Sequence, residues 1–230
     1  MQEGAGQDVL FLHGYLSKKE SFYYQIKFLS RNYRVTAPDF PGFGASAPIT
    51  SAWSVGDYCD WLEKFILAAG LNKPVIIAHS FGARVALKYL AAHPLAAEKL
   101  IITGGAGIVK PRSKEYLRRV KTYRFVKKIF PKFAEKHFGS AEYRTLPPVM
   151  RESYKKIVNE DLRDCAKEIR CKTLLLYGDG DTVTPADEEG KIFNGLIPCS
   201  TLEICKGSHF CFSENPVPFN DAVYKFLNGD

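Results

Sequence analysis

The stretch PVIIAHSFGARVAL, residues 74–87, decides the architecture of this chain. It starts as an unbroken apolar run, typical of a strand buried on both faces, and continues in small and apolar residues that suit a helix. Ser80 stands at the junction. Ala78 and Gly82, two residues before and after it, are small, as a sharp strand-to-helix turn requires. A serine here could cap the helix, but the clear strand before it favours a reactive hydroxyl lifted above the sheet.

Strand-like and helix-like segments alternate on both sides of this stretch, which predicts an α/β fold with a mostly parallel sheet. Strands are expected at residues 8–12, 33–38, 74–78, 99–103, 173–177 and 200–204. Helices are expected at residues 21–31, 54–69, 81–93, 186–196 and 217–227, with Ser54 or Asp57 capping the second and Gly70 ending it. The alternation breaks once, between residues 108 and 170.

The interrupting segment is basic and helix-like. It holds 18 Lys and Arg against 8 Asp and Glu, a net +10, so the rest of the chain, with 14 against 17, carries −3. Its apolar positions at helical spacing include Tyr116, Leu117, Val120, Tyr123, Val126, Ile129, Phe130 and Phe133. We therefore expect a helical cap at 108–170 inserted in a core of residues 1–107 and 171–230. Its cations are expected to form a solvated surface; an anionic substrate, a nucleotide-bearing acyl carrier or an acidic membrane surface is the alternative.

Composition excludes several classes. At 230 residues, 46% hydrophobic and 25% charged, the chain suits one globular domain with an insertion. It has no apolar run near the roughly 18–20 residues of a membrane span and no basic start before an apolar stretch, so a cytoplasmic protein without stable membrane insertion is expected. The six cysteines lack any C-x-x-C pair, which favours reduced thiols and no metal or cofactor. No recognition motif accompanies the basic segment, so no nucleic-acid partner is expected.

A serine nucleophile needs a base to take its proton and a carboxylate to orient that base. GDGDTVTP, residues 178–185, follows the first strand after the insertion, and GSHF, residues 207–210, follows the last strand. Carboxyl ends of parallel strands meet at one edge of the sheet, where sites of such sheets gather. The spacing therefore predicts that His209 and either Asp179 or Asp181 lie near Ser80.

Five motifs in order resemble the α/β-hydrolases over nearly the whole chain. They are HG at 13–14, DFPGFGAS at 39–46, HSFG at 79–82, GDGD at 178–181 and GSH at 207–209. The resemblance implies that Ser80 is the nucleophile, Asp181 the acid and His209 the base. The G-x-x-D spacing of the family favours Asp181 over Asp179. The resemblance also implies an oxyanion hole made by the backbone N–H groups of Phe81 and Tyr15, with Leu16 as an alternative to Tyr15.

Other conspicuous residues have structural interpretations. We expect His13 and His79 to hold the loops around the site by hydrogen bonds. Asp39 and residues 41–44 are expected to shape a turn. The aromatic residues Trp53, Tyr58 and Trp61 are expected to pack a helix rather than bind substrate.

One departure from the family pattern concerns the first residues. The family usually has two antiparallel strands before the His-Gly turn, whereas His13 arrives almost at once here. The family pattern therefore implies that this hairpin is missing from the sequence, and the strand at 33–38 should form an exposed sheet edge. Such an edge would suggest homodimerisation, a truncated gene product or lower stability.

The resemblance predicts a serine hydrolase that cleaves a small carboxylic ester, thioester or lactone through an acyl-enzyme on Ser80. A small acyl compound would be its substrate. A carbon–carbon bond hydrolase with the same triad is an alternative, and so is a non-catalytic ligand-binding protein of the same fold. Dehalogenase and epoxide hydrolase chemistry is disfavoured, because those relatives have an aspartate where this chain has Ser80.

Overall fold

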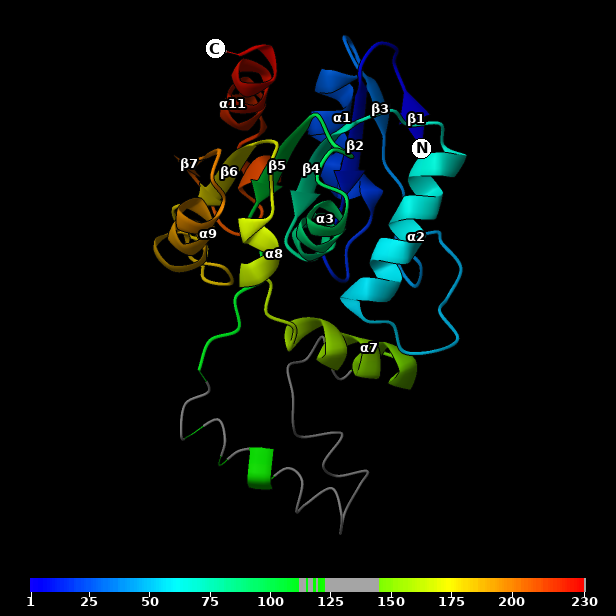
Figure 1. Ribbon diagram of the computed structural model, residues 1–230, viewed down its shortest axis with the longest axis vertical. Helices are drawn as coiled ribbons and strands as arrows, with labels where there is room; N and C mark the ends of the chain where they lie inside the picture. Colours follow the sequence, from blue (N-terminus) through cyan, green and yellow to red (C-terminus); the bar gives the residue numbers. More distant parts are fainter. Residues whose placement is uncertain (112–114, 116–117, 119, 123–144, 230) are drawn as a thin grey trace.

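The computed structural model describes residues 1–111, 115, 118, 120–122 and 145–229 (Figure 1). Within these residues a seven-stranded sheet has the order β1-β3-β2-β4-β5-β6-β7. The strands are β1 (Gln2–Glu3), β2 (Asp8–Leu12), β3 (Arg34–Thr36), β4 (Val75–His79), β5 (Lys99–Thr103), β6 (Lys172–Gly178) and β7 (Ser200–Cys205). Every neighbouring pair is parallel except β1 with β3. The predicted α/β fold with a mostly parallel sheet is confirmed.

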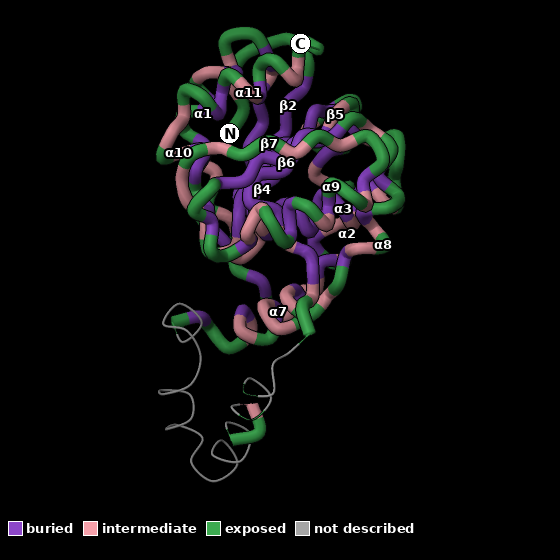
Figure 2. Tube along the Cα trace, turned by 90° about the vertical axis from the view of Figure 1, so that its left-hand side faces the viewer, coloured by how far each residue is buried: buried purple, intermediate pink, exposed green. Residues whose placement is uncertain are grey.

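Helices cover both faces of the sheet. The α-helices are α1 (Tyr23–Leu29), α2 (Val55–Ala68), α3 (Phe81–Ala92), α7 (Pro148–Val158), α8 (Arg163–Lys167), α9 (Lys191–Leu196), α10 (Cys211–Glu214) and α11 (Pro216–Asn228), with a 3-10 turn η1 (Lys19–Phe22) and a π-helical turn η2 (Ala186–Gly190). Leu10 and Leu12 face α2, α3 and α9, whereas Val9 and Phe11 face α1, α10 and α11. Figure 2 shows these two helical layers on either side of the buried strands. Successive residues of a strand point to opposite faces, so the central strands are apolar throughout.

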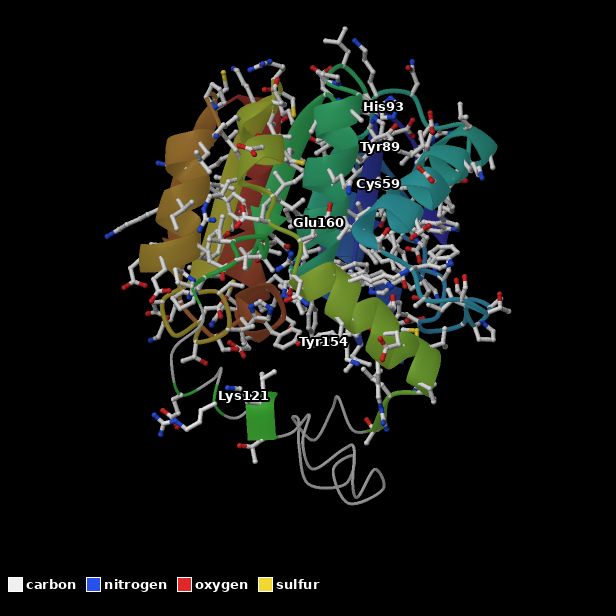
Figure 3. The ribbon with its side chains drawn as sticks, turned by 60° about the horizontal axis from the view of Figure 1, so that its bottom comes forward. Cys59, Tyr89, His93, Lys121, Tyr154 and Glu160 are labelled. Carbon is white, nitrogen blue, oxygen red and sulfur yellow. The ribbon has the colours of Figure 1, made fainter. Side chains whose placement is uncertain are left out.

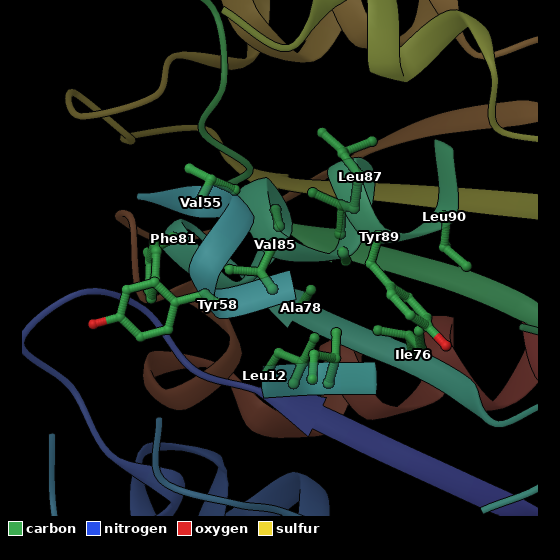
Figure 4. Close-up of a cluster of buried hydrophobic side chains, with 14 of the residues drawn as sticks. Leu12, Val55, Tyr58, Ile76, Ala78, Phe81, Val85, Leu87, Tyr89 and Leu90 are labelled. Carbon is green, nitrogen blue, oxygen red and sulfur yellow. The ribbon is translucent and has the colours of Figure 1, made fainter. Parts of the chain in front are cut away.

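Helix α2 shows how local signals set an element. Ser54 accepts a hydrogen bond from the backbone N–H of Asp57, and the Asp57 carboxylate accepts one from the N–H of Ser54. This capping box satisfies two N–H groups that the helix itself leaves unpaired. The helix presents Val55 and Tyr58 to the core around Phe81 (Figure 4). Both residues predicted as the cap therefore take part in it.

The sheet does not end at β3. Strand β1 pairs antiparallel with it, Gln2 opposite Thr36 and Glu3 opposite Val35. Met1 also exchanges backbone hydrogen bonds with Ala37. The expectation of an open edge at 33–38 is therefore wrong along these residues, because two residues of β1 satisfy backbone groups that the sequence pattern left uncovered. Dimerisation through this side of the sheet stays a prediction.

The predicted cap is described only in part, since residues 112–114, 116–117, 119 and 123–144 lie outside the described residues. Helix α7 lies below the sheet in Figure 1, apart from the two layers. Helix α8, in contrast, packs on α3 and α9, and Ala166 and Ile169 belong to the main core. Within the described residues, no helix combines the length and apolar character needed to cross a membrane. All six cysteines are free thiols.

Candidate active site

Ser80 sits in a strained turn between β4 and α3. Its φ of 51° and ψ of −105° lie in a region that costs a non-glycine residue on the order of 1–3 kcal/mol. A Cβ at Gly82 would come 2.2 Å from the carbonyl oxygen of Leu12, so only glycine lets α3 start this close to β2. Ala78 is fully buried, and its methyl group fits where the family motif has glycine. The Ser80 side chain does not cap α3, so its hydroxyl is not held by that helix.

Asp181 is buried after β6 and surrounded by donors. It accepts hydrogen bonds from the N–H of Val183 at 2.8 Å and from the N–H and hydroxyl of Thr184, both at 2.9 Å. Its Oδ2 also lies 2.8 Å from Nδ1 of His209. Burial alone would raise the pKa of Asp181, but the hydrogen bonds from His209 and Thr184 lower it below its ordinary value. The carboxylate is therefore held ionised beside the imidazole.

The rival carboxylate, Asp179, points elsewhere. Its side chain is exposed and accepts a hydrogen bond from the N–H of Gly207 at 2.8 Å. It braces the turn that precedes His209 and makes no contact with the imidazole in the described residues. Of the two carboxylates, the geometry brings Asp181, which the family spacing favours, to His209.

Two glycines allow the acid and histidine loops to meet. A Cβ at Gly104 would lie 2.9 Å from His209 Nδ1 and 3.3 Å from Asp181 Oδ2. A Cβ at Gly178 would lie 2.2 Å from the carbonyl oxygen of Ser208. With Nδ1–H donated to Asp181, the other ring nitrogen of His209 carries a lone pair. The imidazole is therefore oriented as a proton acceptor.

His79 holds the loop that carries His209. Its Nε2–H donates to the carbonyl oxygen of His209 at 3.0 Å. Burial lowers the pKa of His79 to about 3, so the ring is neutral and keeps this donor at ordinary pH. The interpretation of His79 as a residue that holds a loop is consistent with this contact.

His13 supports the opposite loop in the same way. Its Nδ1–H donates to the carbonyl oxygen of Gly14 at 2.8 Å, and its Nε2 accepts the N–H of Phe40 at 3.0 Å. Burial lowers the pKa of His13, which keeps the ring neutral and both contacts intact. A Cβ at Gly14 would come 2.8 Å from Nδ1 of His79, so the loop passes close to the residue before Ser80.

The expected turn and packing residues behave as interpreted. The buried Asp39 carboxylate accepts hydrogen bonds from the backbone N–H groups of Lys19 and Ala45, and it forms an ion pair with the Lys19 ammonium group. It closes the turn after β3. Tyr58 is fully buried, and Trp53 and Trp61 pack partly buried against the same core.

A cavity of about 620 Å³ joins these groups. Ser80 and His209 line it, together with Tyr15, Leu16 and Phe81. The N–H of Phe81 belongs to the first turn of α3, where no carbonyl of the helix can accept it. Both residues proposed for the second oxyanion donor, Tyr15 and Leu16, therefore lie on the cavity wall.

Helix α7 closes one side of the cavity. Tyr154, Ile157 and Val158 line it, and Figure 3 shows Tyr154 on α7. The hydroxyl of Tyr15 donates to the carbonyl oxygen of Met150 at 2.9 Å, and the Tyr15 and Tyr154 rings lie 5.2 Å apart. Part of the predicted cap thus contacts the loop that carries a candidate oxyanion donor.

Sequence reasoning missed three polar residues of the site. Thr184 bonds Asp181 and lies 3.2 Å from Nδ1 of His209, and Arg84 and Glu189 line the cavity. The lone arginine in the otherwise apolar FGARVAL start of α3 was an available signal. Nothing in the local sequence marks Glu189, because several acidic residues surround it.

The sequence and the fold both resemble those of known proteins. Residues 9–146, more than half of the chain, match the model of the alpha/beta hydrolase fold family. The chain belongs to this family. A probable 1-acylglycerol-3-phosphate O-acyltransferase of Oryza sativa subsp. japonica is 24% identical over 286 residues, covering 96% of this chain and 68% of that protein.

Solved structures share the fold at low sequence identity. A bromoperoxidase of Bacillus anthracis superposes with a TM-score of 0.81 at 20% identity, over 99% of this chain and 94% of the other. An esterase of Exiguobacterium antarcticum superposes with a TM-score of 0.80 at 22% identity and the same coverage of both chains. The protein is thus an α/β-hydrolase-fold hydrolase. Because proteins of one fold act on many substrates, the substrate depends on the residues of the site.

Proposed function

We propose that this protein is a serine hydrolase that cleaves a small carboxylic ester, thioester or lactone through an acyl-enzyme on Ser80. One observation carries the proposal: the buried Asp181–His209 hydrogen bond of 2.8 Å borders the same cavity as Ser80 in its strained turn. The strain supports a reactive serine, since such backbone conformations persist where function needs them.

In this reaction His209 takes the hydroxyl proton as Ser80 Oγ attacks the carbonyl carbon. Asp181 stabilises the imidazolium that forms and stays ionised itself. The negative charge on the carbonyl oxygen is met by the N–H of Phe81 and by that of Tyr15 or Leu16; one such donor is worth about 3–4 kcal/mol in the transition state. His209 returns the proton to the leaving alcohol or thiol. Water, activated by the same imidazole, then releases the acid and frees Ser80.

The cavity size supports a small substrate. About 620 Å³ lies within the roughly 300–1,000 Å³ of small-molecule sites. We propose that residues 108–170 act as a cap, because Tyr154, Ile157 and Val158 already contribute an apolar wall. The esterase among the structural neighbours and the acyltransferase among the relatives both have names that concern acyl groups. Product analysis distinguishes water from an alcohol as the acceptor of the acyl group.

The test is covalent labelling with a fluorophosphonate probe, followed by peptide mass spectrometry. We expect one adduct on Ser80, no adduct in Ser80→Ala, and normal labelling in Ser51→Ala, a control at an exposed serine. Short p-nitrophenyl esters should be hydrolysed by the parent and by Ser51→Ala, but not by Ser80→Ala. A folded parent that neither reacts with the probe nor turns over any ester would favour the non-catalytic binding protein instead.

A further inference from the structure

The cavity beside Ser80 has a charged end that the proposed reaction does not use. Arg84 lies on α3 one turn after Ser80, and Glu189 lies on η2 beyond the Asp181 loop. They are only 7% and 6% exposed, yet both line the cavity. Charged side chains are rarely this buried without a specific reason.

Arg84 uses only part of its guanidinium group for the fold. Nη1 donates to the carbonyl oxygens of Ile157 at 3.0 Å and Glu160 at 2.9 Å, which close the C-terminal end of α7. Figure 3 marks Glu160 beside α3. Nε and Nη2 have no hydrogen-bond partner among the described residues. A guanidinium group carries five N–H donors, so several remain for a ligand.

Glu189 also has an unpaired polar atom. Its Oε2 is buried and has no hydrogen-bond partner in the described part of the chain. Burial raises the pKa of Glu189, and the nearby charges of Lys110 and Arg84 oppose that rise. A buried acceptor without a partner costs about 1–3 kcal/mol, more when it is charged. A ligand group that donates to Oε2 would remove this cost.

Arg84 and Glu189 attract each other electrostatically but do not form a salt bridge with each other. Both residues line the same cavity, and each has hydrogen-bonding capacity that the described residues do not use. The occupant that completes both must accept a hydrogen bond from Arg84 and donate one to Glu189.

We propose that Arg84 and Glu189 form a subsite for a hydroxyl group of the substrate; this rests on the proposed ester hydrolysis at Ser80. A hydroxyl oxygen accepts from the guanidinium group, and its proton is donated to Oε2. A methyl group would leave both charges unsatisfied. A carboxylate would meet the guanidinium group but confront the carboxyl group of Glu189. Four residues of helix rise by about 6 Å, so the hydroxyl lies several bonds from the scissile carbonyl.

The test measures binding without turnover, in the Ser80→Ala protein. Isothermal titration compares three ethyl esters with the same methylene chain: an ω-hydroxyhexanoate, heptanoate with a terminal methyl group, and monoethyl pimelate with a terminal carboxylate. We expect the hydroxy ester to bind about ten- to hundredfold more tightly than the methyl ester, as a hydrogen bond to a charged group allows. Equal Kd values for these two, or tightest binding of the carboxylate, would overturn the proposal.

Two further variants in the Ser80→Ala background locate the effect. Glu189→Gln keeps the size of the side chain but replaces one carboxylate oxygen by an NH2 donor, so the preference for hydroxyl over methyl should fall to less than about threefold. Glu188→Gln is the matched control, because Glu188 is exposed, pairs with Lys110 and does not line this cavity; it should keep the preference. A preference that survives in Glu189→Gln would assign the hydroxyl to another residue.

The measurement separates this inference from the proposed function. Hydroxyl-selective binding by the Ser80→Ala protein, together with a parent that hydrolyses none of the esters, would refute ester hydrolysis and support the subsite. Hydrolysis of all three esters by the parent with no binding preference would support ester hydrolysis and refute the subsite.

Discussion

Thr184→Val tests how Asp181 is kept ionised. The Thr184 hydroxyl donates to Asp181 Oδ2 at 2.9 Å, and the side chain is 2% exposed, so valine fills the same space without the donor. A hydrogen bond to a charged group stabilises the folded protein by about 1.5–3 kcal/mol. Part of this loss is offset in the variant, because valine has no hydroxyl group that must be desolvated on folding. We expect a net loss of about 1–2 kcal/mol in the free energy of unfolding. For a chain of this size that lowers Tm by about 2–8 °C.

The loss should depend on pH in one direction. The pKa of Asp181 is lowered from 3.8 in the folded protein, so its contribution to stability is present above that value and is lost as the pH falls through the folded pKa. Removing one donor raises the folded pKa toward 3.8 and reduces the contribution. The difference between parent and Thr184→Val should therefore be full at neutral pH and vanish in acid below the folded pKa.

The assay is urea unfolding followed by circular dichroism, at neutral pH and at several acid pH values, with Thr182→Val as the matched control at an exposed neighbour. The control should change the free energy of unfolding by less than about 0.5 kcal/mol. If Thr184→Val were as stable as Thr182→Val at neutral pH, or if its deficit persisted unchanged in acid, the assigned role of the hydroxyl would be refuted.

Three other predictions concern the packing at Gly82, the roles of the two aspartates and the basic segment. Gly82→Ala would place a Cβ 2.2 Å from a backbone oxygen and should lower the free energy of unfolding by about 2–3 kcal/mol. Gly56→Ala in α2, where the nearest contact of a Cβ is at 3.4 Å, should raise it by up to about 1 kcal/mol. Equal effects of the two substitutions would contradict the packing argument. Asp181→Asn should lower kcat/KM by about 10³–10⁴, and Asp179→Asn by less than about tenfold; the reverse order in an ester assay would exchange their roles. Duplex DNA should bind weakly or not at all in a fluorescence anisotropy titration, and sub-micromolar, salt-sensitive binding would show that the basic segment serves nucleic acid.

Much of the fold could be predicted because its signals are local. The apolar runs at 99–103 and 200–204 match β5 and β7 to within a residue, and Ser54 and Asp57 form the helix start that their spacing predicts. Residues 186–196 were predicted as one helix, yet the first five form a π-helical turn. This turn carries Glu189, whose place in the cavity wall no local periodicity contains.

The covered edge at β3 illustrates the limit of motif reasoning. The family pattern has a hairpin before the His-Gly turn, and its lack in the sequence suggested an open strand. Two polar residues, Gln2 and Glu3, nevertheless pair with Thr36 and Val35. Backbone hydrogen bonds make this pairing, and they depend little on side-chain type, so no pattern of apolar residues reveals it.

By itself, the sequence determined the alternation of strands and helices, the turn that carries Ser80, and the order of serine, aspartate and histidine at strand ends. These features are local, since burial on one or both faces and the shape of a turn are written in adjacent residues. The tertiary structure alone decided that Thr184 supports the pair of Asp181 and His209 and that Arg84 and Glu189 line the same cavity. Arg84 and Glu189 are 105 residues apart in the chain, and Thr184 and His209 are 25 apart, so no local pattern shows that these side chains share one site.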